Sequence, residues 1–168
     1  MTSLRRATVQ DEDAIAVVQV GSWREAYRRL MPDAVLENLD VASRASTWRE
    51  ILANEDSTCL VAQLQDRVIG FVHVCPCRDV DKEPCSTGEI AAAYCDPSHW
   101  RQGWGTALLR EALGNLKQQG FGEVTLWVLE ENRPGRAFYE KHGFEFEGAK
   151  KILAGLDLVE LRYAKYCE

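Results

Sequence analysis

The stretch at residues 94–109, YCDPSHWRQGWGTALL, decides the fold, because an apolar strand ends there and a helix begins after a glycine turn. Gly103 and Gly105 stand in that turn, where the absence of side chains lets backbone amides approach a ligand closely. The first turn of the following helix offers unpaired N–H groups and about half a positive charge. The stretch therefore predicts a binding loop for a diphosphate, to which Arg101 can add a charged contact.

Two other phosphate-binding patterns do not match this turn. It lacks the G-x-x-x-x-G-K-[ST] pattern of nucleotide triphosphatases, and it is not a G-x-G-x-x-G after the first strand, as in dinucleotide-binding domains. The sequence therefore argues against both classes of nucleotide-binding protein. One alternative stays open from the turn alone, namely a glycine-rich entry into a helix that holds no ligand.

Hydrophobic periodicity outside the turn predicts the remaining strands and helices. Strands are expected at residues 3–7, 57–65, 68–74, 88–95, 123–129, 144–149 and 156–166. Helices are expected at residues 11–29, 41–52, 105–119 and 134–142, with Pro32 ending the first. The strand at 88–95 is nearly all apolar after Glu89, which is typical of a central strand buried on both faces. This order predicts a mixed α/β fold in a single domain over residues 1–168.

Length, composition and charge exclude several classes of protein. The chain has 168 residues, of which 46% are hydrophobic and 27% charged, as in one globular domain. No apolar stretch reaches the roughly 18 residues of a membrane-spanning helix, and the N-terminal residues lack the apolar core of a secretory signal. We therefore expect a cytoplasmic protein with no membrane partner. The net charge of −6, without any basic block, argues against a nucleic-acid partner.

The cysteines and histidines do not predict a metal site. Cysteines stand at positions 59, 75, 77, 85, 95 and 167, and histidines at 73, 99 and 142. No C-x-x-C pair occurs, whereas a structural zinc site needs four ligands at tighter spacing. We expect reduced, mostly buried thiols and no metal cofactor.

A second stretch, LWVLEENRPGRAFYEKHGFEF at residues 126–146, carries the other informative pattern. Asn132 precedes a short helix and Tyr139 follows seven residues later, so both side chains lie near one side of that helix. The stretch matches the pattern N-x-x-[AG]-x-x-[FL]-Y-E-x-x-G-F from Asn132 to Phe144. With this pattern and the earlier glycine turn, the chain resembles the GNAT superfamily of N-acetyltransferases over nearly its whole length.

One position departs from the family pattern. The family's glycine motif is [QR]-x-x-G-x-[GA], and Trp100 stands here at the [QR] place before Gly103 and Gly105. Because that motif contacts phosphate mainly through backbone amides, the departure should cost little. The resemblance implies a central, twisted, mostly antiparallel sheet of six to seven strands, splayed between the fourth and fifth strands and flanked by about four helices.

The resemblance also implies acetyl transfer from acetyl-CoA to an amine. The cofactor would contact the end of the fourth strand, the glycine turn and the helix starts, at Ala93, Tyr94, Cys95, Arg101, Gln102, Gly103, Trp104, Gly105, Thr106 and Asn132. The backbone of the strand end would bind the thioester carbonyl. Asn132 is equally suited to capping its helix. No activating partner for a covalent role of Cys95 is evident, so we expect this residue only to line the site.

Two residues are candidates for moving protons. Tyr139 would protonate the departing thiolate, because a phenol is protonated at neutral pH, although a core aromatic beside Phe138 is the alternative. Glu89 is the candidate base, since strand alternation would place it on one face with Ala93 and Cys95. Three alternatives stay open. Glu89 is a solvated carboxylate without a catalytic role, Glu130 or Glu131 is the base, or a chain of waters takes the proton.

The acceptor remains open at this point. Trp23 and Tyr27 are four residues apart on one helix face and are candidates to wall an acceptor pocket, with Trp48 as a possible third member. Aromatic residues at this spacing are also typical of a core. The leading hypothesis is an enzyme that acetylates a primary amine of a small molecule, as a monomer or homodimer. The alternatives are acetylation of a protein N-terminus or lysine, and a CoA-binding sensor without catalysis.

Overall fold

Seven strands and five α-helices occur in residues 2–167, which are the residues that the computed structural model describes. The strands are β1 (Thr2–Arg6), β2 (Thr58–Leu64), β3 (Arg67–Pro76), β4 (Thr87–Cys95), β5 (Glu123–Leu129), β6 (Glu145–Leu153) and β7 (Leu158–Tyr166). The helices are α1 (Glu12–Ala26), α2 (Asp33–Glu37), α3 (Val41–Ala53), α4 (Trp104–Gln118) and α5 (Arg133–Lys141).

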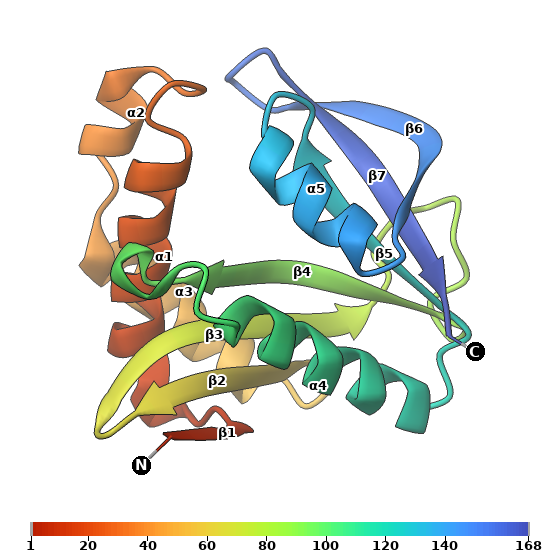
Figure 1. The fold of residues 1–168 in the computed structure, drawn as a ribbon, viewed down its shortest axis with the longest axis horizontal. Coiled ribbons are helices and arrows are strands. Elements are labelled where there is room, and N and C mark those ends of the chain that lie inside the picture. Colours follow the sequence, from red (N-terminus) through yellow and green to blue (C-terminus); the bar gives the residue numbers. More distant parts are fainter. Residues whose placement is uncertain (1, 168) are drawn as a thin grey trace.

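The strands form one sheet in the order β1-β2-β3-β4-β5-β7-β6 (Figure 1). Every neighbouring pair is antiparallel except β4 and β5, which run parallel. The expected mixed α/β fold with a mostly antiparallel sheet is therefore confirmed. The short helix α2 was not expected; it begins directly after Pro32, whose fixed φ suits the start of a helix. The first helix also ends earlier than expected, at Ala26.

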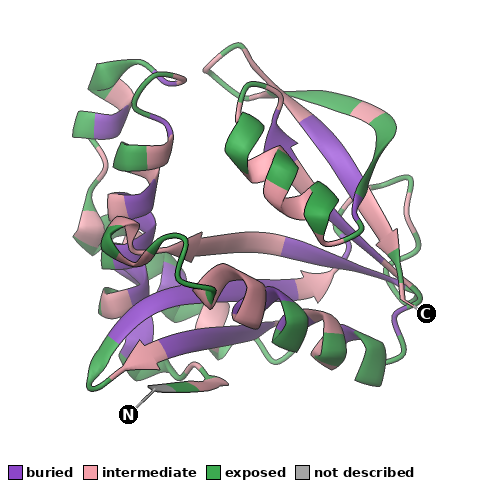
Figure 2. Ribbon diagram, in the orientation of Figure 1, coloured by how far each residue is buried: buried purple, intermediate pink, exposed green. Residues whose placement is uncertain are grey.

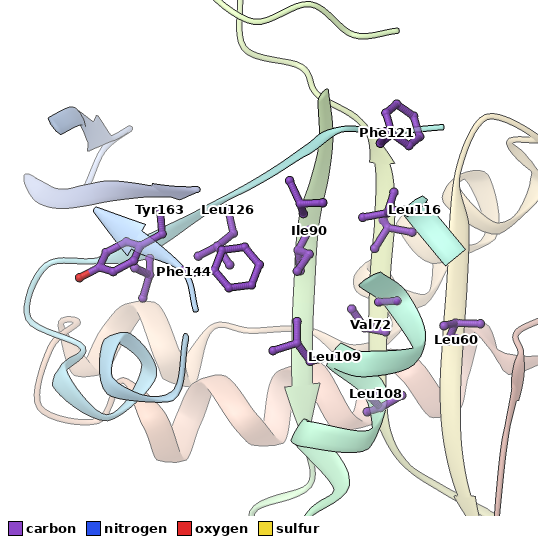
Figure 3. Close-up of a cluster of buried hydrophobic side chains, with 14 of the residues drawn as sticks. Leu60, Val72, Ile90, Leu108, Leu109, Leu116, Phe121, Leu126, Phe144 and Tyr163 are labelled. Atoms are coloured by element: carbon purple, nitrogen blue, oxygen red, sulfur yellow. The ribbon is translucent and has the colours of Figure 1, made fainter. Parts of the chain in front are cut away.

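Helices cover the two faces of the sheet (Figure 1). The helix α4 places apolar side chains at helical spacing, including Leu108, Leu109 and Leu116, against β2, β3 and β4 (Figure 3). The helices α1 and α3 cover the opposite face, where Ile15 and Trp48 pack with the strand residues Val61 and Phe71. Two apolar layers thus enclose the half of the sheet that β4 borders.

The strand β4 changes its surroundings halfway along its length. Residues 87–90 are buried, whereas residues 91–95 are partly exposed (Figure 2). The expectation of a strand buried on both faces is therefore wrong for its second half. The reason is that β5 pairs with β4 only from Thr87 to Ile90 and then continues beside β7 alone.

A β-bulge reverses the faces of β4 after Ile90. In the pairing with β3, Val74 lies opposite Ile90 and His73 opposite Ala92, which leaves Ala91 without a partner. The expectation that Glu89, Ala91, Ala93 and Cys95 share one face is therefore wrong. Ala93 faces α4, whereas Glu89 faces the side covered by α1 and α3.

Residues 2–167 contain neither a membrane-spanning helix nor a cluster of metal ligands. Within the described range 2–167, no helix has the length and apolar character needed to cross a bilayer. The described side chains include no group of three or more His, Cys, Asp or Glu placed to hold a metal ion. All six cysteines are free thiols, but the expectation that most of them are buried is wrong, since only Cys59 and Cys77 are fully buried.

Candidate active site

The site is built around the gap that forms where β5 leaves β4 (Figure 1). The amide of Asp96 donates to the carbonyl of Ile69, which fixes the hydrogen-bonding direction at the end of β4. Because successive residues turn their backbone groups to opposite strand edges, Ala93 and Cys95 direct theirs into the gap and Tyr94 directs its own toward β3. Backbone N–H groups therefore face the gap at two of the three predicted positions.

The glycine turn lies at the start of α4. Gly103 caps this helix with φ +90°, a left-handed conformation that glycine adopts without strain. A Cβ atom at Gly103 would meet no protein atom within 4 Å, so the space beside it is open to a ligand. The amides of Trp104, Gly105 and Thr106 belong to the first helical turn and have no acceptor within the helix. The turn therefore fits a diphosphate, as the sequence predicts.

Trp100 has a role that its place in the motif did not suggest. Its indole N–H donates to the carbonyl of Cys95 over 2.8 Å, and the hydroxyl of Ser22 donates to the same oxygen over 2.5 Å. Arg67 pairs with Asp96, whose carboxylate also accepts the amide of Ser98. These bonds fix the glycine turn to the end of β4 and to α1.

Asn132 is the N-cap of α5. Its side-chain oxygen accepts the amide of Gly135 over 3.1 Å. A Cβ atom at Gly135 would lie 2.5 Å from the side-chain Nδ2 of Asn132, so the Asn132 side chain closes tightly over this glycine. The capping alternative is therefore present in the structure, and the proposed contact with the cofactor stays a prediction.

Tyr139 lies on α5 and faces the gap from the other side. Its ring packs edge-on against Phe138 and Phe144, at centroid distances of 5.2 and 5.8 Å. Burial, with the nearby Tyr94 and Cys95, raises the pKa of Tyr139 above its usual value, so the phenol keeps its proton at neutral pH. Among residues 2–167 no hydrogen bond contributes to this shift, and the hydroxyl can donate to a ligand.

Cys95 lies beside this phenol but has no activating group. Burial, followed by the charge of Asp96, raises the pKa of its thiol to about 11. The thiol is therefore protonated at neutral pH, and the protonated form is a poor nucleophile. The structure thus gives the Cys95 side chain the surroundings of a lining residue.

The predicted acceptor residues gather around Tyr94, on the face covered by α1. Trp23 lies edge-on to Tyr27 at 5.3 Å and 6.3 Å from Tyr94. The hydroxyls of Tyr27 and Tyr94 are 3.3 Å apart. The indole N–H of Trp23 is close enough to Tyr94 to lower its pKa, yet it is buried without a hydrogen bond of ordinary geometry. Tyr27 is itself buried, so an acceptor would contact its hydroxyl end and not the face of its ring.

Trp48 lies farther from the gap. It is buried against Phe71 and His73, and its indole N–H donates to Gln19 over 2.8 Å. Trp48 is therefore part of the core. It also lines a groove between the helices α1 and α3 and the strands β3 and β4.

Glu89 is held by Arg78. Its carboxylate accepts three bonds from this arginine, from the backbone amide and from Nε at 3.1 Å each and from Nη2 at 2.7 Å. Only 4% of Glu89 is exposed. It also lies in the part of β4 that is still paired with β5, opposite Thr125. The carboxylate is therefore far more constrained than the strand pattern suggested.

Glu160 of β7 is a functional candidate that the sequence did not reveal. It pairs across the sheet with Leu129, which packs with Tyr27, so its carboxylate lies on the side of the tyrosine pair. Burial raises the pKa of Glu160, and Lys151 at 3.8 Å opposes this shift only in part. Burial raises the pKa values of Tyr27 and Tyr94, and the charge of Glu160 adds to both shifts.

Known proteins with similar sequences and structures fit this geometry. The model of the Acetyltransferase (GNAT) family matches residues 21–144. The chain is 30% identical to the uncharacterized N-acetyltransferase YuaI of Bacillus subtilis (strain 168), over 98% of this chain and 97% of that protein. It is 26% identical to the spermidine N(1)-acetyltransferase of Thermoplasma acidophilum, over 86% of this chain and 88% of that one.

A solved structure has the same fold. The PaiA N-acetyltransferase from Thermoplasma acidophilum, crystallised with coenzyme A, superposes with a TM-score of 0.78 over 99% of each chain, at 22% sequence identity. The expected sheet, opened between β4 and β5, is thus a known architecture.

Proposed function

The chain belongs to the GNAT family of acetyltransferases, and from this premise we propose that it transfers the acetyl group of acetyl-CoA directly to a primary amine of a small molecule. The observation that carries the proposal is the gap between β4 and β5, which Tyr139 faces from one side and the backbone of Ala93 and Cys95 from the other. The glycine turn at Gly103 stands at the end of this gap and leaves space for a diphosphate.

Several groups of the chain would bind acetyl-CoA and assist the reaction of its thioester. Acetyl-CoA would supply the activated acetyl thioester. The amides of the first turn of α4, with Arg101, would hold its diphosphate. The amide of Ala93 or Cys95 would donate to the carbonyl oxygen, where negative charge develops during attack. Because the phenol of Tyr139 is protonated at neutral pH, it would donate its proton to the departing sulfur.

Glu160 is our choice for the group that takes the proton of the amine. Its half-buried carboxyl has a raised pKa, which brings it nearer to the range that a base at neutral pH requires. Its charge acts on both phenols of the Tyr27–Tyr94 pair, whose hydroxyls lie 3.3 Å apart and offer a path for the proton. Glu89 is the alternative base, but three bonds to Arg78 hold its carboxylate in place on β4.

A small acceptor is favoured over a protein chain by the contacts at one end of the site. Tyr27 and Met31, which follow α1, and Leu36 of α2 pack in one apolar cluster with Leu129 of β5. The cluster also includes three leucines of the β6–β7 hairpin region, Leu153, Leu156 and Leu158. These contacts join the two walls between which an extended peptide would have to pass.

Release of free thiol from acetyl-CoA tests the proposal directly. The enzyme would be assayed with polyamines, amino acids, aminoglycosides and short peptides, each at the same amine concentration. We expect turnover with one class of small amine at least tenfold above that with peptides. Turnover with peptides alone would support the protein acetyltransferase instead, and coenzyme A binding without any turnover would support a sensor.

A further inference from the structure

A groove of about 400 Å³ adjoins the acceptor side of the site. It lies between the helices α1 and α3 and the strands β3 and β4, and its lining includes Arg44, Trp48, His73 and Ala92. Ala92 immediately precedes Ala93, whose backbone faces the gap. The lining of the groove therefore includes the residue next to Ala93 in the chain.

One positive charge in this groove is not neutralised by a carboxylate. The lining contains three charged side chains, namely Arg44, Asp56 and Arg78. Arg78 is paired with Glu89, and Asp56 is exposed in the turn after α3. Arg44 has no carboxylate partner among the described residues, and its guanidinium lies 5.5 Å from the ring centroid of Trp23. A carboxylate of a ligand would therefore find a partner in Arg44, at the end of the groove next to Trp23.

A buried polar group in the same lining also lacks a partner. His73 is only 7% exposed, and its Nε2 forms no hydrogen bond within residues 2–167. Burial, with the charge of Arg78, lowers the pKa of His73 to about 4, so the ring is neutral and carries one N–H. Buried polar atoms nearly always have a partner, and a polar ligand in the groove would supply the missing one.

Trp23 connects this groove to Tyr94. Its ring centroid lies 5.5 Å from the guanidinium of Arg44 and 6.3 Å from the ring centroid of Tyr94. Burial raises the pKa of Tyr94, and the charge of Glu160 adds to this shift whereas the charge of Arg44 opposes it. An acceptor with its amine near Glu160 and an anionic group near Arg44 would match both charges.

We propose that the acceptor is a small amine that also carries a carboxylate, and that Arg44 binds this carboxylate at the end of the groove next to Trp23. The inference rests on the proposed function and names its substrate class. The planar fork of an arginine matches the two oxygens of a carboxylate. A polyamine without a carboxylate would instead bring a second cation toward Arg44, which disfavours that class.

Matched pairs of acceptors test this inference. Glycine, β-alanine and 4-aminobutyrate would each be compared with the corresponding carboxamide, and spermidine would be assayed beside them. The wild-type enzyme should have a higher kcat/KM for at least one acid than for its amide. Arg44→Gln should lower kcat/KM for that acid by about 10- to 100-fold and for the amide by less than about threefold, as expected when one charged hydrogen-bonding group is lost.

Two further variants separate carboxylate binding from a general effect of charge. Arg44→Lys keeps the charge and should retain part of the preference for the acid. Arg49→Gln removes the same charge from the same helix, at a position that is paired with Glu12 outside the groove, and should leave the preference unchanged. Calorimetry should give the same affinity for coenzyme A in all of these proteins.

The possible failures are distinguishable. Turnover of amides or spermidine as fast as of acids, or an equal loss with acid and amide in Arg44→Gln, would overturn the carboxylate subsite and leave the proposed function intact. Absence of thiol release with every amine would overturn the proposed function and this inference together.

Discussion

The hydroxyl groups of Tyr27 and Tyr94 lie 3.3 Å apart, and this contact joins the end of α1 to β4 beside the gap in the sheet. Burial raises the pKa values of both phenols, so both hydroxyls carry their protons at neutral pH. Such a pair can relay a proton, because each hydroxyl can donate one proton while it accepts another. Because the charge of Glu160 acts on both phenols, the pair connects the predicted acetyl position to a carboxylate on a distant strand.

The first prediction concerns the base. Glu160→Gln should lower kcat/KM at pH 7 by about 100- to 10,000-fold, the usual worth of general base catalysis. The loss should shrink toward pH 10, since the reference ammonium pKa is about 10.4 and solvent then supplies the free amine. The measurement is a pH–rate profile of both proteins from pH 6 to about 10.

Glu89→Gln provides the comparison for that profile. Its carboxylate holds Arg78, so we expect a lower melting temperature and a small change in rate that does not depend on pH. If Glu89→Gln instead gave the large, pH-dependent loss and Glu160→Gln did not, the roles would be reversed. Parallel profiles for all three proteins would leave a chain of waters as the base.

The second prediction concerns Tyr139. Tyr139→Phe removes only the hydroxyl and keeps the packing against Phe138 and Phe144. The turnover number should fall by about 100- to 10,000-fold, because the departing thiolate loses its proton donor, while affinity for coenzyme A should hardly change. A rate within about threefold of the wild type, far below that range, would assign Tyr139 to packing alone.

The parts of the site that the sequence predicted are those that lie close together in the chain. The turn at Gly103 and the helix that begins with Asn132 each depend on local geometry, namely a left-handed glycine and a side-chain cap. Local patterns of this kind can be found in a single sequence. The aromatic pair of Trp23 and Tyr27 was found in the same way, from helical spacing.

The parts that the sequence did not predict depend on the pairing of distant strands. One unpaired residue, Ala91, turns Glu89 to the opposite face, and nothing in the alternation of apolar residues marks that bulge. Glu160 reaches the site only because β7 pairs with β5. Its one local signal was a carboxylate on a strand whose other face carries the buried Leu161 and Tyr163.

The third prediction concerns the glycine turn. Gly103→Val should weaken coenzyme A binding by at least about tenfold, because valine is strained at φ +90° and its side chain would occupy the space reserved for the diphosphate. Calorimetry on the folded variant measures this effect. Gly114→Ala is the matched control, since it adds a side chain on the exposed face of the same helix and should leave affinity unchanged. Unchanged affinity in Gly103→Val would contradict the assignment of the turn.

The fourth prediction concerns the response of stability to pH. Burial holds His73 neutral by lowering its pKa from 6.5 to about 4, whereas in the unfolded chain it titrates near 6.5. Between these values the unfolded state binds more protons than the folded state, so acid favours unfolding. The free energy of unfolding should fall by about 3 kcal/mol as the pH drops from about 6.5 to about 4.

Denaturation with urea at several pH values in that range measures the effect, and two variants isolate its source. His73→Phe and His73→Asn cannot titrate there, so their stability should change less over the same interval, whatever each substitution costs at pH 7. This pH interval lies above the usual pKa of aspartate. Pairing with Arg5 holds the pKa of Asp11 lower still. Ion pairs of this kind are therefore lost only at more acidic pH. An equal loss of stability in the wild type and both variants between pH 6.5 and 4 would show that His73 is already protonated or accessible in the folded protein.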